Sequence, residues 1–461
     1  MFKTLKYLIF FLFVITDFLG NSQNQKIYKI SITGNTKTKE RVINRATGIS
    51  LNDTIPKKEL AVKLKEAKVN LINTSLFNSV QVSELSTGNL TEVIIMVEER
   101  WYFWPYLILE NAETNFNTWW QTKKLNRLNY GLNLNKENTR GANEYLIFVV
   151  QLGYSKQIGL GYKIPFFNEK TNFGGEFWTL YKQRREIVYG TENNKRQFLT
   201  EPNNGKLRQE FFSKFILTYS ENYNRKHSVE TRYQHAFLGD TILDINPNYF
   251  GNNKNFINYI AISYNYRIDK RNNRAYPLKG YFLDFGLHQK GLGLLYKENS
   301  ATYSIIQLRK YGEIKPRLNY GVSIKSRINL KNDIPYYFQQ ALGYDDFVRG
   351  FEYYVIDGEH YGLLKSSLKY TLVKPKIKKL KWPKDFRFNN FQYALYLNSY
   401  VDAGYVQNNY SGSFNNYSNK LISGYGIGLD LVTYYDKIVR FEYSFNNFGE
   451  NGFYLHFRQP I

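Results

Sequence analysis

An alternation of apolar and polar side chains runs through most of the chain and constrains its fold more than any other feature. In the last segment, Phe453, Leu455 and Phe457 share one face of a strand, and polar or polar-tipped residues occupy the other. Aromatic residues make up 18% of the 461 residues, yet no apolar run after residue 20 approaches the roughly 20 residues of a membrane helix. Strands that are apolar on one face only account for both observations.

From Arg100 onward the chain reads as strand after strand, with connections rich in Asn, Gly and Lys. At roughly 22 residues for each strand and its connection, the region holds about 16 strands of ~10 residues, a usual size for outer-membrane barrels. The expected strands span residues 103–111, 127–137, 142–153, 155–165, 172–184, 207–220, 226–237, 255–268, 279–289, 301–312, 316–330, 361–373, 390–403, 421–432, 437–446 and 452–460.

A closed barrel is the form in which an apolar sheet face can meet lipid, because every backbone polar group must be paired within the hydrocarbon layer. A soluble β-sandwich also alternates and is the alternative. The strand count, the aromatic content and the N-terminal segment favour the barrel. We therefore predict a mainly β protein, in which residues 100–461 form an antiparallel transmembrane β-barrel of about 16 strands.

The N-terminal residues 1–22 have the layout of a secretory signal peptide. Lys3 and Lys6 precede an apolar stretch at 7–14, and small or polar residues end at Gly20 and Ser22. A membrane anchor is the alternative reading, but the apolar core is too short to span a bilayer. Export from the cytoplasm is the expectation.

Residues 26–99 have a different pattern from the rest of the chain. The stretch KIYKISITG alternates as a strand, and two segments with apolar residues at helical spacing follow it, the second containing Leu60, Leu64 and Leu71. Two more alternating stretches flank the turn STGN. The order strand, helix, helix, strand, strand predicts a small α+β domain (β-α-α-β-β) before the barrel.

Composition excludes several kinds of chemistry. The chain has no cysteine, so it can form no disulfide, thiolate metal site or lipid-modified cysteine. The five histidines are scattered without ligand spacing, and no serine nucleophile motif is present, so we expect no enzyme, no metal and no cofactor. The net charge of +23 is spread along the chain without a nucleic-acid-binding motif, which leaves anionic lipid headgroups or unfolded polypeptides as partners, and not nucleic acid.

Several motifs resemble a known family. GN at 34–35, SLFNSVQV at 75–82 and VEER at 97–100 resemble a POTRA (polypeptide-transport-associated) domain. In the barrel region, the family motifs are YPLKGYFLDFGL at 276–287, VRGF at 348–351, VDAGYV at 401–406, and GYGIGLDL followed by the terminal GFYLHFRQPI. In this order they resemble the BamA/TamA outer-membrane assembly and translocation superfamily, also called the bacterial surface antigen family.

The resemblance implies a role for the VRGF motif, which comprises Val348, Arg349, Gly350 and Phe351 and falls in the connection between the eleventh and twelfth strands. In the family this loop folds back into the barrel, where its arginine meets acidic residues of the inner wall. Asp402 matches the acidic partner position, and strand parity places it toward the lumen. An Arg349–Asp402 pair is therefore expected.

Two departures from the family are visible. Lys369 occupies an inward position where relatives often have a glutamate, which places a second positive charge near Arg349. Asp430 or Glu442 would have to compensate that charge, so we expect a lumenal charge network of Lys369, Asp430 and Glu442. The chain ends on Gln459, Pro460 and Ile461 instead of an aromatic residue. Pro460 cannot donate a ladder hydrogen bond, which suits a fraying terminal strand and the lateral gate that the family implies.

The motif YPLKG at 276–280 is interpreted as a tight periplasmic turn without a separate function.

The resemblance also implies a function without catalysis. It predicts an outer-membrane protein with its N-terminal domain in the periplasm, assisting the assembly, insertion or translocation of proteins. Its partners would be outer-membrane lipids, unfolded or extended client polypeptides bound by strand addition, and periplasmic or lipoprotein accessory subunits. A dedicated secretion or lipid-transport barrel is the alternative, favoured by the room for only one POTRA-like domain. A passive pore is a further alternative, but it requires neither the POTRA-like domain nor an inward loop and is therefore disfavoured.

Overall fold

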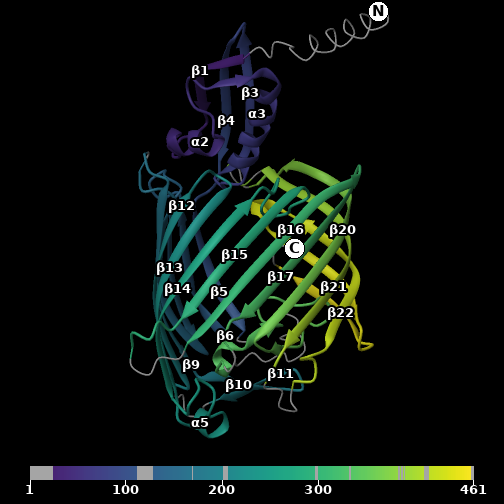
Figure 1. Cartoon of the computed structure of the whole chain (residues 1–461). Coiled ribbons are helices and arrows are strands. Elements are labelled where there is room, and N and C mark those ends of the chain that lie inside the picture. Colours follow the sequence, from purple (N-terminus) through teal and green to yellow (C-terminus); the bar gives the residue numbers. More distant parts are fainter. Residues whose placement is uncertain are drawn as a thin grey trace, which may run out of the picture. The chain divides into compact units, whose positions relative to one another are not determined.

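The computed structural model describes residues 24–111, 128–168, 170–200, 206–295, 300–331, 334–382, 385, 388, 390–409 and 415–457. The predicted signal peptide and the last four residues lie outside the described residues. The chain forms two compact units that divide between Glu99 and Arg100 (Figure 1). Within the described residues, no helix combines the length and apolarity that crossing a bilayer requires.

The N-terminal unit is a four-stranded sheet with two helices. Its elements are β1 (Asn24–Thr33), α2 (Glu40–Thr47), β2 (Thr54–Pro56), α3 (Lys57–Ile72), β3 (Phe77–Thr87) and β4 (Leu90–Glu99). The sheet order is β2-β1-β4-β3, with β1 parallel to β4, and α3 packs on β3. Leu60, Leu64 and Leu71 are buried, as their helical spacing predicts. The short β2 was not predicted, because three residues are too few to show an alternation.

Glu99, at the end of β4, holds the turn that follows β1. Its carboxylate accepts hydrogen bonds from Thr36 Oγ1 and from the backbone N–H of Thr38, each at 2.6 Å. Burial alone would raise the pKa of the Glu99 carboxyl, but these hydrogen bonds outweigh burial, and the pKa lies below its ordinary value. Gly34 opens the turn at φ 89°, and a Cβ there would overlap the carbonyl oxygen of Val97. The motifs at 34–35 and 97–100 therefore form one structural element.

We expect Glu99→Gln to destabilise the N-terminal unit by about 1–3 kcal/mol, because backbone and hydroxyl donors lose a charged acceptor. Since the pKa of Glu99 is depressed on folding, its contribution is present above the unfolded pKa and is lost as the pH falls through the folded pKa. Hydrogen exchange of residues 34–40 in the full chain measures both effects. The control Glu84→Gln removes an exposed carboxylate of β3, and equal exchange in both variants would contradict the assignment.

The second unit is an antiparallel sheet of 16 strands, which Figure 1 shows wrapped into a barrel. The first eight strands are β5 (Phe103–Asn111), β6 (Leu128–Glu137), β7 (Tyr145–Gly153), β8 (Ser155–Ile164), β9 (Phe173–Arg184), β12 (Arg208–Ser220), β13 (Arg225–Leu238) and β14 (Phe256–Asp269). The last eight are β15 (Gly280–Lys290), β16 (Ala301–Lys315), β17 (Leu318–Asn329), β20 (His360–Lys379), β21 (Asn390–Gln407), β22 (Leu421–Val432), β23 (Ile438–Asn446) and β24 (Asn451–His456). The predicted 16-stranded architecture is confirmed.

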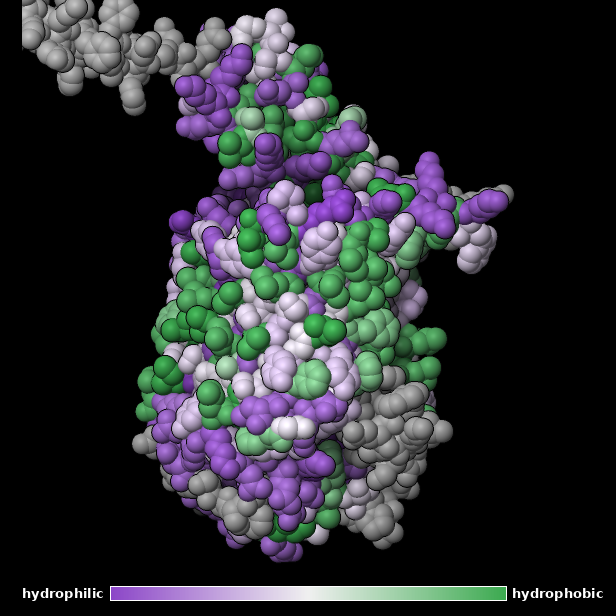
Figure 2. Space-filling view, turned by 90° about the vertical axis from the view of Figure 1, so that its right-hand side faces the viewer, coloured by the Kyte–Doolittle hydropathy of each residue, from purple (hydrophilic) through white to green (hydrophobic). Residues whose placement is uncertain are grey.

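The strand faces divide as the alternation requires. On β24, Phe453 is 81% exposed and its neighbour Tyr454 only 5%. Hydrophobic residues spread over the middle of the barrel face in Figure 2, and hydrophilic residues gather at its lower end. The outward face is thus suited to lipid, and the inward face carries the polar and charged groups.

Successive antiparallel strands give the barrel two rims. We call the rim where β5 begins the N-terminal rim and the opposite one the loop rim. The loop rim carries the long connections, including β10 (Glu186–Glu192), β11 (Lys195–Thr200) and α5 (Thr241–Ile245). The loop that contains VRGF, residues 330–359, also starts and ends there and holds η1 (Tyr336–Phe338), β18 (Gln340–Leu342) and β19 (Ile356–Asp357). These short elements were not predicted, because contacts between loops create them.

Candidate functional site in the barrel lumen

The VRGF motif lies between β18 and β19, which pair with each other and fold the loop back on itself. Val348 and Phe351 are buried in an apolar cluster with residues of the barrel wall such as Val406 and Ile422. Gly350 has a positive φ of 91°, a conformation that favours glycine. These contacts direct the side chain of Arg349 into the wall.

Arg349 and Asp402 form a bidentate ion pair. The distances are 2.7 Å from Arg349 Nε to Asp402 Oδ2 and 2.6 Å from Nη2 to Oδ1. Nη2 also donates to the carbonyl oxygen of Ser366 at 2.9 Å, and the guanidinium carbon lies 3.8 Å from the ring centroid of Tyr400. The arginine is 1% exposed and the aspartate 0%. A charge this deeply buried is stable only when its partner is present and well oriented.

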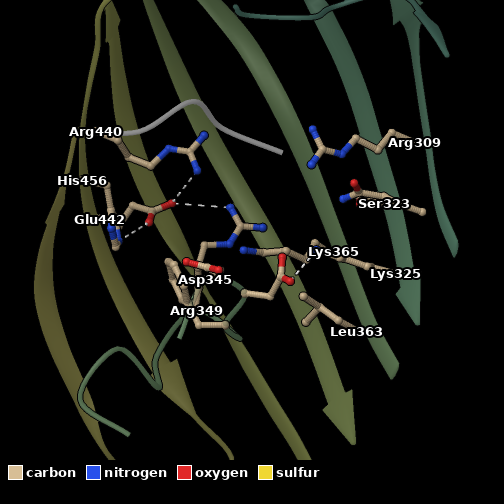
Figure 3. A pocket seen from close by; sticks show the side chains of 13 residues that line it. Arg309, Ser323, Lys325, Asp345, Arg349, Leu363, Lys365, Arg440, Glu442 and His456 are labelled. Carbon is tan, nitrogen blue, oxygen red and sulfur yellow. Dashed lines mark hydrogen bonds and ion pairs between the residues drawn. The ribbon is translucent and has the colours of Figure 1, made fainter. Parts of the chain in front are cut away.

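Glu442 connects this pair to a second one. Its Oε1 lies 3.5 Å from Arg349 Nη1 and 3.4 Å from Arg440 Nη1. Arg440 in turn makes a bidentate pair with Asp430, at 2.6 and 2.9 Å. Figure 3 shows Arg349, Arg440 and His456 converging on Glu442. Acidic and basic groups therefore alternate from the loop across β21, β22 and β23.

The last strand joins the same network through His456. Its Nε2 is 3.2 Å from Glu442 Oε2 and 3.5 Å from Glu352 Oε1. Glu352 also accepts a hydrogen bond from the backbone N–H of Gly350 at 2.8 Å. Glu352, Glu442 and His456 are close enough to share a metal ion, and the guanidinium groups of Arg349 and Arg440 also face Glu442.

Glycines of the wall let the loop approach. A Cβ on Gly424 would overlap the carbonyl oxygen of Arg349, and a Cβ on Gly404 would come 2.7 Å from Val348 Cγ2. On Gly426, a Cβ would lie 2.6 Å from the hydroxyl oxygen of Tyr400. Gly404 of VDAGYV and Gly424 of GYGIGLDL thus leave the space into which VRGF packs, whereas Gly426 makes room for Tyr400.

Lys369 points inward and is buried, as parity predicts. Asp430 and Glu442 lie in one buried network, but they meet through Arg440 and not through Lys369. In the part of the chain that the structure describes, the Nζ of Lys369 donates no hydrogen bond; it lies 4.5 Å from the ring centroid of Tyr276. A cation–π contact stands where an ion pair was expected.

Tyr276, the first residue of YPLKG, does more than close a turn. Its hydroxyl donates to Asp430 Oδ2 at 2.7 Å, and its ring stacks on Tyr396 at 4.6 Å between centroids. The network thus reaches from the loop to a connection at the N-terminal rim. The sequence analysis missed Tyr276, Arg440 and His456, although the parity of Arg440 with Glu442 on β23 was a usable signal.

A cavity of about 430 Å³ lies beside Arg349 in the lumen (Figure 3). Five basic side chains and three carboxylates line it: Arg309, Lys325, Arg349, Lys365 and Arg440, with Asp345, Asp346 and Glu442.

The fold and this locked loop define an outer-membrane β-barrel that holds a folded-back loop inside its lumen. A family model for the Omp85 superfamily domain matches residues 138–455, and the chain belongs to this superfamily, whose barrels reside in the outer membrane. The resemblance of the motifs to the BamA/TamA family is thereby confirmed.

Solved structures that share the fold include two outer-membrane barrels. One is BamA from Haemophilus ducreyi lacking POTRA domains 1–3, with 14% identity, a TM-score of 0.51, and coverage of 94% of this chain and 84% of that chain. The other is CdiB from Escherichia coli, with 11% identity, a TM-score of 0.58, and coverage of 94% of this chain and 75% of that chain. Such identities show a common fold alone. A search of curated proteins gave no match.

We expect Asp402→Asn to release the loop. The variant leaves the Arg349 charge buried with one acceptor oxygen in place of two, which costs about 3–5 kcal/mol when a buried pair is broken. The measurement is the rate of protease cleavage within residues 330–359 of the folded protein. The control Asp284→Asn removes another bidentate partner, that of the half-exposed Arg267, and should leave the loop protected. Equal protection of the loop in both variants would refute its anchoring by Asp402.

A Gly424→Ala substitution tests the packing of the loop against the wall. The added methyl group meets backbone, not a flexible side-chain end, so the loop must move away, at a cost of about 1–3 kcal/mol. The matched control is Gly362→Ala on β20, where a Cβ meets no atom within 4 Å. Hydrogen exchange at residues 348–352 should rise in the first variant only; a rise in both, or in neither, would argue against direct contact.

Proposed function

We propose that this protein assists the assembly, insertion or translocation of polypeptides at the outer membrane, with its N-terminal unit in the periplasm. The observation that carries the proposal is the Arg349 loop locked to Asp402 inside an Omp85-superfamily barrel, which follows a small α+β unit in the same chain. The mechanism is noncovalent, so it requires positioned surfaces and no catalytic residue.

The N-terminal unit provides a surface for extended clients. In the sheet order β2-β1-β4-β3, the strand β3 is an edge, and its residues from Ser83 to Thr87 are exposed. An edge strand offers unpaired backbone N–H and C=O groups, to which an extended segment can add as a further strand. Such binding uses backbone hydrogen bonds and is therefore compatible with many client sequences, as a protein with several clients requires.

The barrel offers a seam between its first and last strands. The last strand, β24 (Asn451–His456), pairs with β23, and the first strand, β5, pairs with β6. Among the described residues, β24 and β5 form no hydrogen-bonded ladder with each other. Opening at this seam would give a client strand access to lipid from the lumen. His456 on β24 contacts Glu442 and Glu352, so the loop site lies where it can stabilise the last strand.

Depletion of the protein followed by quantitative outer-membrane proteomics tests the proposal. A fall of many barrel proteins, reversed by the wild-type chain and less well by Asp402→Asn, is the result expected for a general assembly role. Loss of a single exported partner would instead identify a dedicated translocator. An unchanged outer-membrane proteome, together with altered permeability to small solutes, would refute polypeptide handling in favour of a passive pore.

A further inference from the structure

One hairpin of the barrel extends well beyond the sheet at the N-terminal rim. The pairing of β20 with β17 ends at Tyr370, and the pairing of β21 with β22 ends at Ala394. The ladder between β20 and β21 nevertheless continues to Lys379 opposite Asn390. Residues 373–379 and 390–393 thus form a two-stranded ribbon, roughly 20 Å long, with no third strand beside it among the described residues.

The ribbon is strongly basic. Between Glu359 and Asp385 the sequence has eight lysines and no acidic residue. The lysines at the ribbon and just beyond it are all exposed: Lys374, Lys376, Lys378, Lys379 and Lys381. An anionic surface beside the ribbon would relieve the mutual repulsion of these like charges.

The outward face of the ribbon continues the lipid-facing column of the barrel. Residues opposite each other in an antiparallel ladder share a face, and Leu397 on that face is opposite Tyr370. Farther out, Tyr393 and Phe391 stack at 6.1 Å between ring centroids. Their ladder partners are lysines: Lys376 is opposite Tyr393, and Lys378 is opposite Phe391.

Along this column aliphatic side chains are followed by aromatic rings, and the rings lie level with the lysines opposite them. Aromatic side chains concentrate at the membrane interface, and lysines reach the headgroups beyond it. Ile377 and Trp382, the latter 82% exposed, add apolar groups among the lysines. The change from aliphatic to aromatic and basic side chains therefore matches the change from the hydrocarbon core of a leaflet to its interface.

The edges of the ribbon are poorly suited to binding another protein strand. Pro375 lies in the irregular part of the ladder between Val373 and Lys376. Proline and lysine on edge strands discourage the addition of a further strand. The composition favours a lipid surface over a protein partner that pairs with the ribbon.

We propose that residues 373–382 and 390–393 bind the phosphate-bearing headgroups of anionic lipids in the leaflet at the N-terminal rim. The lysines contact the headgroups, and the rings of Phe391 and Tyr393 lie at the interface. This contact anchors the edge of the barrel beside β20 and β21 and enriches anionic lipid there. It does not depend on which polypeptides the protein handles.

The test measures the preference of the full-length protein for phosphatidylglycerol over phosphatidylcholine, using spin-labelled lipids in mixed bilayers. In the variant with Lys374, Lys376, Lys378 and Lys379 all replaced by Gln, the preference should fall by roughly fivefold or more, since each lysine near an anionic surface contributes a factor of that order. Replacing the same four residues by Arg should preserve the preference. Heat-modifiable gel migration shows that each variant is folded.

The matched control removes four exposed lysines from connections at the loop rim: Lys195, Lys206, Lys331 and Lys420. It changes the net charge equally and should retain the preference. An unchanged preference in the ribbon variant, or an equal fall in both variants, would overturn the proposal. Loss of a cross-linked acidic protein from the ribbon variant with an unchanged lipid preference would overturn it in favour of a protein partner.

Discussion

The burial of a guanidinium group is the constraint on which the inside of this barrel depends. Arg349 cannot lose its charge by deprotonation, and at 1% exposure it has no access to bulk water. The loop can therefore occupy the lumen only if the wall supplies a carboxylate in the right orientation, and Asp402 does so. Desolvation offsets much of the attraction within such a buried pair, so its net contribution to stability is small, whereas the loss of one partner is costly.

The rest of the site follows from that pair. Asp402 lies on β21, so the adjacent β22 must present glycine where the backbone of the loop passes, and Gly424 does. Glu442 on β23 contacts both Arg349, the partner of Asp402, and Arg440, the partner of Asp430. His456 on β24 also contacts Glu442 and so links the last strand to the network. A single network thus joins the loop to the terminal strands, so a displacement of the loop would change the contacts of β23 and β24.

The hairpin of β20 and β21 has two roles in this arrangement. Toward the lumen its residues hold the arginine, through Asp402 and the carbonyl of Ser366. Toward the lipid and beyond the rim, the same two strands present rings and lysines. Period-two alternation makes this possible, because neighbouring residues of one strand face different solvents.

The sequence by itself determined the strand count, the inward direction of side chains such as Asp402 and Lys369, and the presence of a small α+β unit before the barrel. These depend on local alternation and on turn residues, which the sequence displays directly. It also pointed to Arg349 and Asp402, although through resemblance to a family and not through spacing, since 53 residues separate them.

Only the tertiary structure decided how the other charges of the lumen meet. The contact of Lys369 with Tyr276 and the pairing of Asp430 with Arg440 depend on the register and closure of the sheet. The same is true of the extension of β20 and β21 beyond the neighbouring strands. Parity says which face a residue is on, but not which residue lies opposite it. That information resides in long-range strand pairing, to which no local pattern gives access.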